Sequence, residues 1–355
     1  MLKLNIIHFI LLLLLFTVTI QAKDYSQKKV TKNFINMMVK EHQFKKSYLT
    51  KLFKDVKFQQ VALGMFNPKY RKKTKKSNDK ESNKKKQIVK LGSWDRYEKM
   101  LLGDTRVKKG VAYMRDYRMI FSKVYKEYGV PPEYITAIIG VESYYGYNRG
   151  KFPVFDTLST LAFEENRRSK YFRYELKKFL LLSKSEKFNP KKVKGSFAGA
   201  IGLGQFMPSA YTPFAVDFNK DGKKSMQTTS DAIAGIANYF KKNGWKKGEP
   251  VAVRVSYEGN RYTERKTGYP YKYSRVELDG ITPKYVKWHY DGKVRLIKLK
   301  RYFYDELWYG AKNFYVITRY NHSSYYAMAI HQLAQKIKNG YQKKYSNELI
   351  SKINE

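Results

Sequence analysis

One predicted helix stands out in the sequence. The segment Gly129–Gly146, GVPPEYITAIIGVESYYG, has helical spacing throughout. Pro131 and Pro132 suit its first turn, where a backbone N–H has no intrahelical acceptor. The final glycine suits the exit from a helix. We therefore expect one apolar helix across this segment, packed within the core of a mainly helical protein.

A single carboxylate lies on the apolar face of this helix. Glu142 follows Ile135, Ile138 and Ile139 by seven, four and three residues, so it shares their buried face in the last turn. Burial and the negative end of the helix dipole should both raise its pKa. A carboxyl group that stays protonated near neutral pH suits acid-catalysed cleavage of a glycosidic bond. The alternative is a glutamate that caps or pairs inside the core.

The absence of cysteine excludes several classes of site. The 355 residues contain none, which excludes disulfides, a disulfide-linked partner, thiolate metal sites and a lipid-modified cysteine. Residues 1–22 are typical of a secretory signal, with Lys3 before the apolar run Leu4–Ile20 and Ala22 at a suitable cleavage position. Because the run is long, its retention as a membrane anchor is the alternative. We expect an exported protein that is not a lipoprotein.

The charge balance is strongly basic. The net charge of +41 comes from 71 Lys and Arg residues against 30 Asp and Glu residues. Nucleic acid is the usual partner of such a chain, but export argues against it. An anionic wall polymer or a membrane surface fits the compartment better. Alternatively, much of this charge is solvated surface, because lysine and asparagine are abundant throughout.

The fold class predicted is mainly α (α+β), and the length suggests about two domains. A Lys-rich stretch has ten basic and two acidic residues and reads as a linker or an insertion without an assigned role. Alternating polar and β-branched residues further on predict a small β-rich region. The expected parts are a signal (1–22), an N-terminal helical region (23–70), the Lys-rich stretch (71–90), a helical core (91–250), the β-rich region (251–314) and a C-terminal helix that returns to the core (315–355).

A glycine-rich segment, Gly195–Tyr211, has the sequence GSFAGAIGLGQFMPSAY. Its glycines allow the backbone to approach a ligand closely, and Ser196 and Gln205 are polar groups at that approach. Met207 stands where a dinucleotide-binding fingerprint needs its third glycine, which argues against a phosphate site. The alternative is a glycine-rich turn that leads into a helix at Pro208.

The segment Asp217–Thr228, DFNKDGKKSMQT, matches the first half of an EF-hand calcium loop. Thr228 replaces the bidentate glutamate of position 12, and Asp231 at position 15 could serve in a longer loop. Three lysines in the loop would weaken cation binding, and a surface Asx-turn is the alternative. The candidate oxygen ligands are Asp217, Asn219, Asp221, the carbonyl of Lys223, and Asp231.

Several blocks in this order resemble the membrane-bound lytic transglycosylase B family, which are peptidoglycan-cleaving enzymes with a lysozyme-like core. The similarity runs from about Phe34 to Ile337, interrupted by the Lys-rich stretch. The family's founding members carry a lipid on an N-terminal cysteine, which this chain lacks. The blocks are GVPPEYITAIIGVESYYG, FEENRRSKYF, KGSFAGAIGLGQFMPSAY with AVDFNKDG, DAIAGIANYFKKNGW and NFYVITRYNHSSYYAMA.

The resemblance implies a role for each candidate residue. Glu142 would be the single catalytic acid/base, and Arg167 and Arg168 would meet carboxylates of the glycan or its stem peptide. The EF-hand-like loop would hold a weakly bound structural Ca²⁺, with no cofactor needed for catalysis. The sugar-binding cleft would contain Tyr97, Ser196, Gln205, Tyr320, Asn321 and Tyr326.

The implied reaction is cleavage of the β-1,4 bond between N-acetylmuramic acid and N-acetylglucosamine, with a 1,6-anhydromuramoyl product. The implied partners are periplasmic peptidoglycan glycan strands, with proteins of cell-wall synthesis or division as further candidates and no nucleic acid. A lysozyme-type muramidase, which hydrolyses the same bond, is one alternative. A non-catalytic cell-wall-binding protein is the other.

Overall fold

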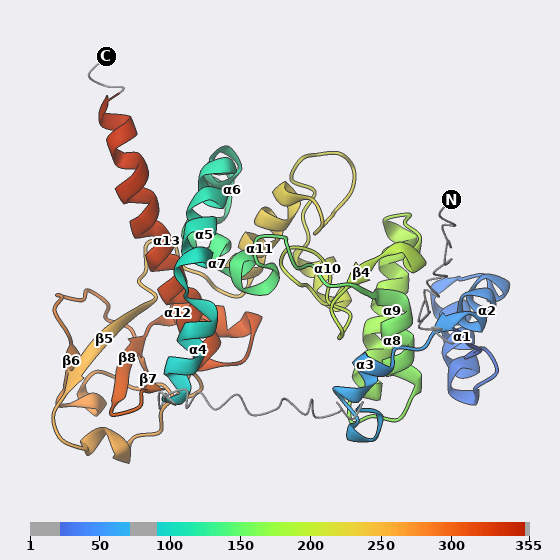
Figure 1. Cartoon of the computed structure of the whole chain (residues 1–355), viewed down its shortest axis with the longest axis horizontal. Helices are drawn as coiled ribbons and strands as arrows, with labels where there is room; N and C mark the ends of the chain where they lie inside the picture. Colours follow the sequence, from blue (N-terminus) through green and yellow to red (C-terminus); the bar gives the residue numbers. More distant parts are fainter. Residues whose placement is uncertain (1–21, 72–90, 352–355) are drawn as a thin grey trace, which may run out of the picture.

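The structure is a computed structural model that describes residues 22–71 and 91–351 (Figure 1). The molecule is elongated, with α1 (Lys29–His42) and α2 (Lys46–Lys54) at one end and a four-stranded sheet at the other. Helix α7 (Pro132–Ser143) lies between these ends. The predicted signal segment and Lys-rich stretch lie outside the described residues, apart from Ala22 and Arg71. No helix within the described ranges is long and apolar enough to cross a membrane.

Helices dominate the architecture. Helix α13 packs on α7 and α5, α8 packs on α9, and α11 packs on α6. The remaining helices are α3 (Gln60–Gly64), α4 (Ser93–Leu101), α5 (Asp104–Asp116), α6 (Arg118–Tyr128), α8 (Val154–Phe163), α9 (Ser169–Ser185), α10 (Pro208–Phe214), α11 (Thr229–Lys242), α12 (Lys312–Tyr320) and α13 (Ser324–Ser351), with 3-10 turns at Pro68–Tyr70, Pro190–Lys192, Arg261–Glu264 and Val276–Leu278.

The four-stranded sheet is antiparallel, in the order β6-β5-β8-β7, and has a small hydrophobic core of its own. Two minor two-stranded sheets pair β1 with β2 and β3 with β4. The predicted mainly helical class with a small β-rich region is thus confirmed. The strands are β1 (Ala22–Lys23), β2 (Val56–Lys57), β3 (Phe152–Pro153), β4 (Lys194–Gly195), β5 (Ala252–Tyr257), β6 (Ile281–Pro283), β7 (Arg295–Lys300) and β8 (Asp305–Gly310).

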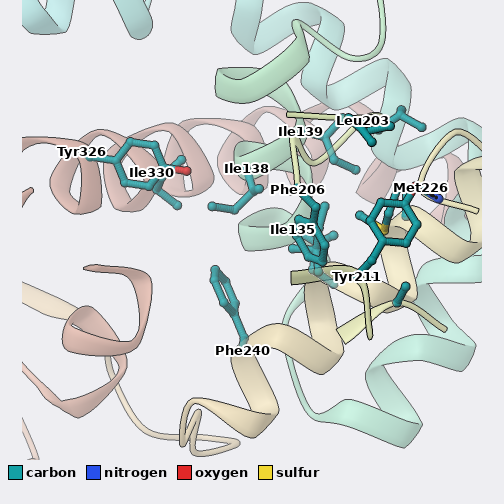
Figure 2. Close-up of a cluster of buried hydrophobic side chains, with 14 of the residues drawn as sticks. Ile135, Ile138, Ile139, Leu203, Phe206, Tyr211, Met226, Phe240, Tyr326 and Ile330 are labelled. Carbon is teal, nitrogen blue, oxygen red and sulfur yellow. Dashed lines mark hydrogen bonds between the residues drawn. The ribbon is translucent and has the colours of Figure 1, made fainter. Parts of the chain in front are cut away.

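Helix α7 begins as its sequence predicts. Pro131 is the N-cap residue and Pro132 occupies the first helical position. Ile135, Ile138 and Ile139 are fully buried. Figure 2 shows these three isoleucines with Phe206 and Tyr211 from the glycine-rich segment and Tyr326 from α13. The face that carries Glu142 is therefore built into the main core.

The expected end of this helix at Gly146 is wrong by three residues. The helix ends at Ser143, and the next two residues, Tyr144 and Tyr145, have left-handed φ values of 51° and 61°. This turn directs the ring of Tyr145 against Gly140, where a Cβ atom would lie 2.6 Å from the tyrosine hydroxyl. Packing of that ring into the core outweighs the strain of the left-handed backbone.

The C-terminal helical pattern also divides into two helices, α12 and α13. Asn321, His322 and Ser323 separate them, and the Ser323 hydroxyl accepts a hydrogen bond of 3.2 Å from the N–H of Tyr326. A serine in this position satisfies an N–H that has no acceptor within the new helix. The break places Tyr320 and Tyr326 on different helices.

Candidate active site

Glu142 lies in the last turn of α7 and faces α13. Its Oε1 atom accepts a hydrogen bond of 2.7 Å from the Tyr326 hydroxyl. Its other oxygen, Oε2, has no hydrogen-bond partner in residues 22–71 or 91–351. The side chain is partly exposed, whereas Tyr326 is buried. One carboxylate oxygen is therefore anchored by Tyr326, and the other is left without a hydrogen-bond partner among the described residues.

The surroundings of Glu142 shift its protonation equilibrium. Desolvation by the dense packing around the carboxyl group raises its pKa from an ordinary 4.5 to about 7. The hydrogen bond from Tyr326 acts in the opposite direction, because it stabilises the carboxylate. Near neutral pH both protonation states are thus populated. A group of this kind can donate a proton in one step and accept one in another.

The charge of Glu142 acts on three tyrosine hydroxyl groups, of which that of Tyr326 is in direct contact with it. Burial raises the pKa values of Tyr97, Tyr320 and Tyr326, and the charge of Glu142 adds to the increase in all three. These side chains come from α4, α12 and α13, so distant segments converge on Glu142. All three hydroxyls are neutral at neutral pH, and the raised pKa values reflect how strongly this site disfavours a second negative charge beside Glu142.

Two of these tyrosines are held firmly by neighbouring groups. The Tyr320 hydroxyl donates to the carbonyl of Gly204 at 2.5 Å. The ring of Tyr97 stacks on Trp94 and meets Tyr325 edge to face. The Tyr325 hydroxyl in turn lies 2.8 Å from the Ser93 hydroxyl. The position of Tyr325 beside the site was not predicted from its sequence, where only its neighbour Tyr326 was singled out.

The glycine-rich segment packs against other segments of the same chain. A Cβ atom on Gly202 would lie 2.3 Å from the carbonyl of Met226, and one on Gly204 would lie 2.7 Å from the Tyr320 hydroxyl. Helix α10 then begins at Pro208. These contacts agree with the alternative of a tight turn into a helix. They also bring the segment directly to the tyrosines around Glu142.

The two polar residues of this segment have different surroundings. Gln205 has a left-handed φ of 50°, and its Nε2 donates to the carbonyls of Gly202 at 2.8 Å and Arg149 at 3.2 Å. Ser196 stabilises the turn itself, since its hydroxyl accepts hydrogen bonds from the N–H groups of Ala198 and Ala200. Both side chains remain partly exposed.

The remaining predicted cleft residues are exposed. Asn321 directly follows Tyr320 at the end of α12. Arg167 borders a surface cavity of about 640 Å³ beside α3, and the guanidinium of Arg168 lies 4.2 Å from the ring centre of Tyr171. Within the described ranges, no hydrogen bond or ion pair joins either arginine to Glu142.

Three of the carboxylates that follow Glu142 in sequence are engaged elsewhere, and Glu165 is exposed. Asp156 pairs with Lys191 at 3.3 Å, and Glu164 pairs with Lys23 at 2.8 Å. Glu175 accepts hydrogen bonds from the N–H and hydroxyl of Ser209, at the start of α10. No neighbouring carboxylate contributes to the pKa shift of Glu142. Among the described residues, Glu142 is therefore an isolated acid.

The EF-hand-like loop is ordered by its own carboxylates. Asp217 accepts hydrogen bonds from the N–H groups of Asp221 and Gly222, and Asp221 accepts one from the N–H of Lys223. Asp231 is buried in the first turn of α11, and both of its oxygens accept backbone N–H groups. Across the described residues, no three His, Cys, Asp or Glu side chains form a metal-binding cluster.

This chain is similar in sequence to known enzymes of one kind. A family model for the transglycosylase SLT domain matches residues 26–335. The membrane-bound lytic murein transglycosylase B of Escherichia coli (strain K12) is 37% identical over 316 residues, which cover 88% of this chain and 84% of the relative.

Solved structures give the same result. The Escherichia coli lytic transglycosylase SLT35, solved in complex with bulgecin A and with calcium, is 36% identical with a TM-score of 0.79, covering 92% of this chain and 98% of that one. Catenated SltB1 from Pseudomonas aeruginosa is 34% identical with a TM-score of 0.78, covering 90% of this chain and 100% of that one. The predicted lysozyme-like helical fold and the resemblance stated from the sequence are confirmed.

Proposed function

Because this chain belongs to the transglycosylase SLT domain family and is a peptidoglycan lytic transglycosylase, we propose that Glu142 is its only catalytic acid/base. The observation that carries this proposal is the isolation of a carboxyl group with a pKa of about 7. Its Oε1 is anchored by Tyr326, and its Oε2 has no hydrogen-bond partner among the described residues. Such a group can serve as the acid and then as the base of one reaction.

In the first step, protonated Glu142 donates its proton to the oxygen that joins N-acetylmuramic acid to N-acetylglucosamine. The bond between this oxygen and C1 of the muramoyl residue breaks, and positive charge develops at that carbon. The muramoyl N-acetyl group can stabilise this charge, as in substrate-assisted glycosidases. The Tyr326 hydroxyl stabilises the carboxylate that Glu142 becomes, because its hydrogen bond favours the charged form.

In the second step, the Glu142 carboxylate accepts the proton of the muramoyl 6-hydroxyl. The oxygen of that hydroxyl bonds to C1, so that a 1,6-anhydro ring forms and no water is consumed. The attacking group belongs to the same sugar as the carbon it attacks, which removes the entropic cost of bringing in a second molecule. Glu142 ends the cycle protonated and ready for another bond.

We propose that the sugar chain is bound by residues around this acid. Tyr97 is partly exposed and can offer an aromatic face and a hydroxyl to a sugar, and Asn321 is exposed beside Tyr320. Tyr320 and Tyr326 form the wall of the site, where their hydroxyls donate to Gly204 and Glu142. The partly exposed Ser196 and Gln205 extend this set along the glycine-rich segment. Arg167 and Arg168 are exposed cations at the start of α9 that suit the carboxylates of a stem peptide.

A lysozyme-type hydrolase is the alternative chemistry for this fold. Such an enzyme uses a second carboxylate as base or nucleophile. Asp156, Glu164 and Glu175 are each engaged by a lysine or a serine away from Glu142. Mass spectrometry of fragments released from purified peptidoglycan tests the proposal. We expect 1,6-anhydromuramoyl ends, whereas products heavier by one water would contradict it.

We further propose that the EF-hand-like loop binds one calcium ion with a structural role. The SLT35 relative is solved in complex with calcium. Oxygen-only donors, at Asp217, Asn219, Asp221 and the Lys223 carbonyl, match the preference of this ion. Asp231 is the proposed ligand at position 15, and its oxygens also accept N–H groups of the loop backbone. Three lysines and the missing position-12 glutamate should keep the affinity low.

We also propose a periplasmic location, with peptidoglycan strands as the partner. The relative in Escherichia coli is named membrane-bound, and the N-terminal segment of this chain is typical of an export signal. Partners from cell-wall synthesis or division stay a prediction. Detection of the protein in a periplasmic extract, with and without detergent, would separate a cleaved signal from a retained anchor.

A further inference from the structure

The turn between β7 and β8 presents three consecutive aromatic side chains to solvent. Tyr302 is 42% exposed, Phe303 91% and Tyr304 50%. The turn is closed by a hydrogen bond of 3.0 Å from the N–H of Arg301 to the carbonyl of Tyr304. Neither the core of the sheet nor the site around Glu142 uses these rings. We call these three residues the aromatic turn.

The aromatic turn stands on a rigid base formed with α4. The guanidinium of Arg301 donates to Asp95, Glu98 and Glu306, and the N–H of Tyr302 donates to Asp95 at 3.0 Å. A Cβ atom on Gly92 would lie 2.3 Å from the backbone of Arg301, so the two segments touch directly. The rings are consequently held outward by a fixed scaffold, which is how a preorganised binding surface is built.

Around the aromatic turn, acidic side chains are held in ion pairs and several basic side chains are exposed. The acids Asp95, Glu98 and Glu306 share the guanidinium of Arg301. Glu306 also pairs with Arg254, and Asp305 pairs with Lys298. Exposed cations directly follow or precede these residues in the sequence: Arg96 follows Asp95, Lys99 follows Glu98, and Lys300 precedes Arg301. Arg96 and Lys99 are three residues apart and so share one face of the helix. The surface seen by a partner therefore combines protruding aromatic rings with positive charge.

We propose that the aromatic turn docks this enzyme on the surface of an anionic phospholipid bilayer. Aromatic side chains are favoured at the boundary between headgroups and acyl chains, where the ring of Phe303 would enter and the hydroxyls of Tyr302 and Tyr304 would stay with the headgroups. Lysines and arginines beside them are attracted to anionic headgroups.

The absence of cysteine allows a site-specific test. A Tyr304→Cys variant of the full chain, labelled with an environment-sensitive fluorophore, reports burial of the turn however the rest of the chain binds. A Tyr48→Cys variant is the control, because Tyr48 is 42% exposed on α2, at the other end of the molecule. On vesicles of phosphatidylglycerol and phosphatidylethanolamine we expect a blue shift, and quenching by brominated lipid, at position 304 only.

A second substitution examines the ring that protrudes furthest. Adding Phe303→Ser to the labelled Tyr304→Cys protein should lower the vesicle partition coefficient about tenfold, as expected when a large apolar side chain no longer leaves water. Adding Tyr48→Ser should leave it unchanged. The melting temperature should stay constant, because Phe303 is 91% exposed and packs little.

Three results would overturn the proposal. The first is an equal response of the labels at 304 and 48, which would mean non-specific adsorption. The second is a response at 304 as strong on zwitterionic as on anionic vesicles. The third is a response to purified peptidoglycan fragments without any response to vesicles, which would identify the aromatic turn as a glycan-binding surface.

Discussion

Tyr326 donates a hydrogen bond of 2.7 Å to Glu142 Oε1 across the interface of α13 and α7. The two residues are 184 positions apart in the chain. Where they meet, two opposing effects act on the pKa of Glu142. Burial raises the pKa of Glu142, whereas the hydroxyl of Tyr326 lowers it, and the result is about 7. A carboxyl group balanced in this way can act as both acid and base near neutral pH.

Replacing Glu142 by glutamine should abolish turnover without unfolding the protein. Glutamine keeps the shape and volume of the side chain but cannot exchange a proton. We expect at least about a hundredfold loss in the rate of muropeptide release. The rate should be measured beside the melting temperature of the same preparation. Retained activity in a folded Glu142→Gln protein would disprove the assignment.

The same substitution should change how stability depends on pH. The pKa of Glu142 is raised in the folded state, so the folded state binds more protons than the unfolded state between about pH 4.5 and 7. Stability from this group is thus fully present below pH 4.5 and is lost as the pH rises towards 7. The difference in melting temperature between Glu142→Gln and the wild type should therefore shift in favour of Glu142→Gln as the pH rises from 4.5 to 7. A difference that stays constant over this range would argue against burial of the acid.

Removal of one hydroxyl group should shift the pH–rate profile. Tyr326→Phe removes the hydrogen bond that lowers the pKa of Glu142, so this pKa should rise. A hydrogen bond to a charged group is worth about 1.5–3 kcal/mol, which corresponds to about one to two pH units. The alkaline limb of kcat/KM should move upward accordingly. Tyr341→Phe, on the same helix, is the matched control and should leave the profile unchanged.

How much of this site follows from sequence depends on the kind of contact. The place of Glu142 on an apolar helix face follows from the spacing of Ile135, Ile138 and Ile139, because helical periodicity is local. Its approach to Tyr97, Tyr320 and Tyr326 depends on the packing of three other helices, so only the family resemblance indicated it. The left-handed turn at Tyr144 was not predicted, because burial of the next tyrosine ring decides it.

Amide replacement of the carboxylates that follow Glu142 in the sequence should separate stability from catalysis. Glu175→Gln should lower the melting temperature, because Glu175 is buried and accepts two hydrogen bonds from Ser209. The kcat of Glu175→Gln should stay within a few fold of the wild-type value. The same is expected for Asp156→Asn, Glu164→Gln and Glu165→Gln, so each of these variants should turn over about tenfold or more faster than the Glu142→Gln protein. A second replacement as damaging as Glu142→Gln would indicate a two-carboxylate hydrolase.

Calcium should stabilise the fold weakly and leave bond cleavage unchanged. We expect an affinity of about 10⁻⁴–10⁻³ M, as in extracellular calcium modules. Several millimolar calcium should then raise the melting temperature by about one to a few degrees over a chelator, since the ion binds only the native state. Asp217→Asn should abolish this increase. Equal melting temperatures of the wild type in calcium and in chelator would refute the site.

Acid should destabilise the protein through His331, a buried histidine that the reaction does not use. Its Nδ1 lies 2.9 Å from the Tyr134 hydroxyl, which also accepts a hydrogen bond from Gln335. Burial lowers the pKa of His331 from 6.5 to about 4. The unfolded chain therefore binds more protons than the folded one between these values, so stability from this group is present above pH 6.5 and is lost as the pH falls towards 4.

The sign of this effect is opposite to that of Glu142, so the two groups can be separated by substitution. We expect His331→Gln to lose less melting temperature than the wild type when the pH is lowered from 7.5 to 4.5. His322→Gln, at an exposed histidine between α12 and α13, should follow the wild type. Because both variants keep Glu142, its contribution is common to all three proteins and cancels in the comparison. Parallel curves for His331→Gln and the wild type would show that this histidine is not buried in its neutral form.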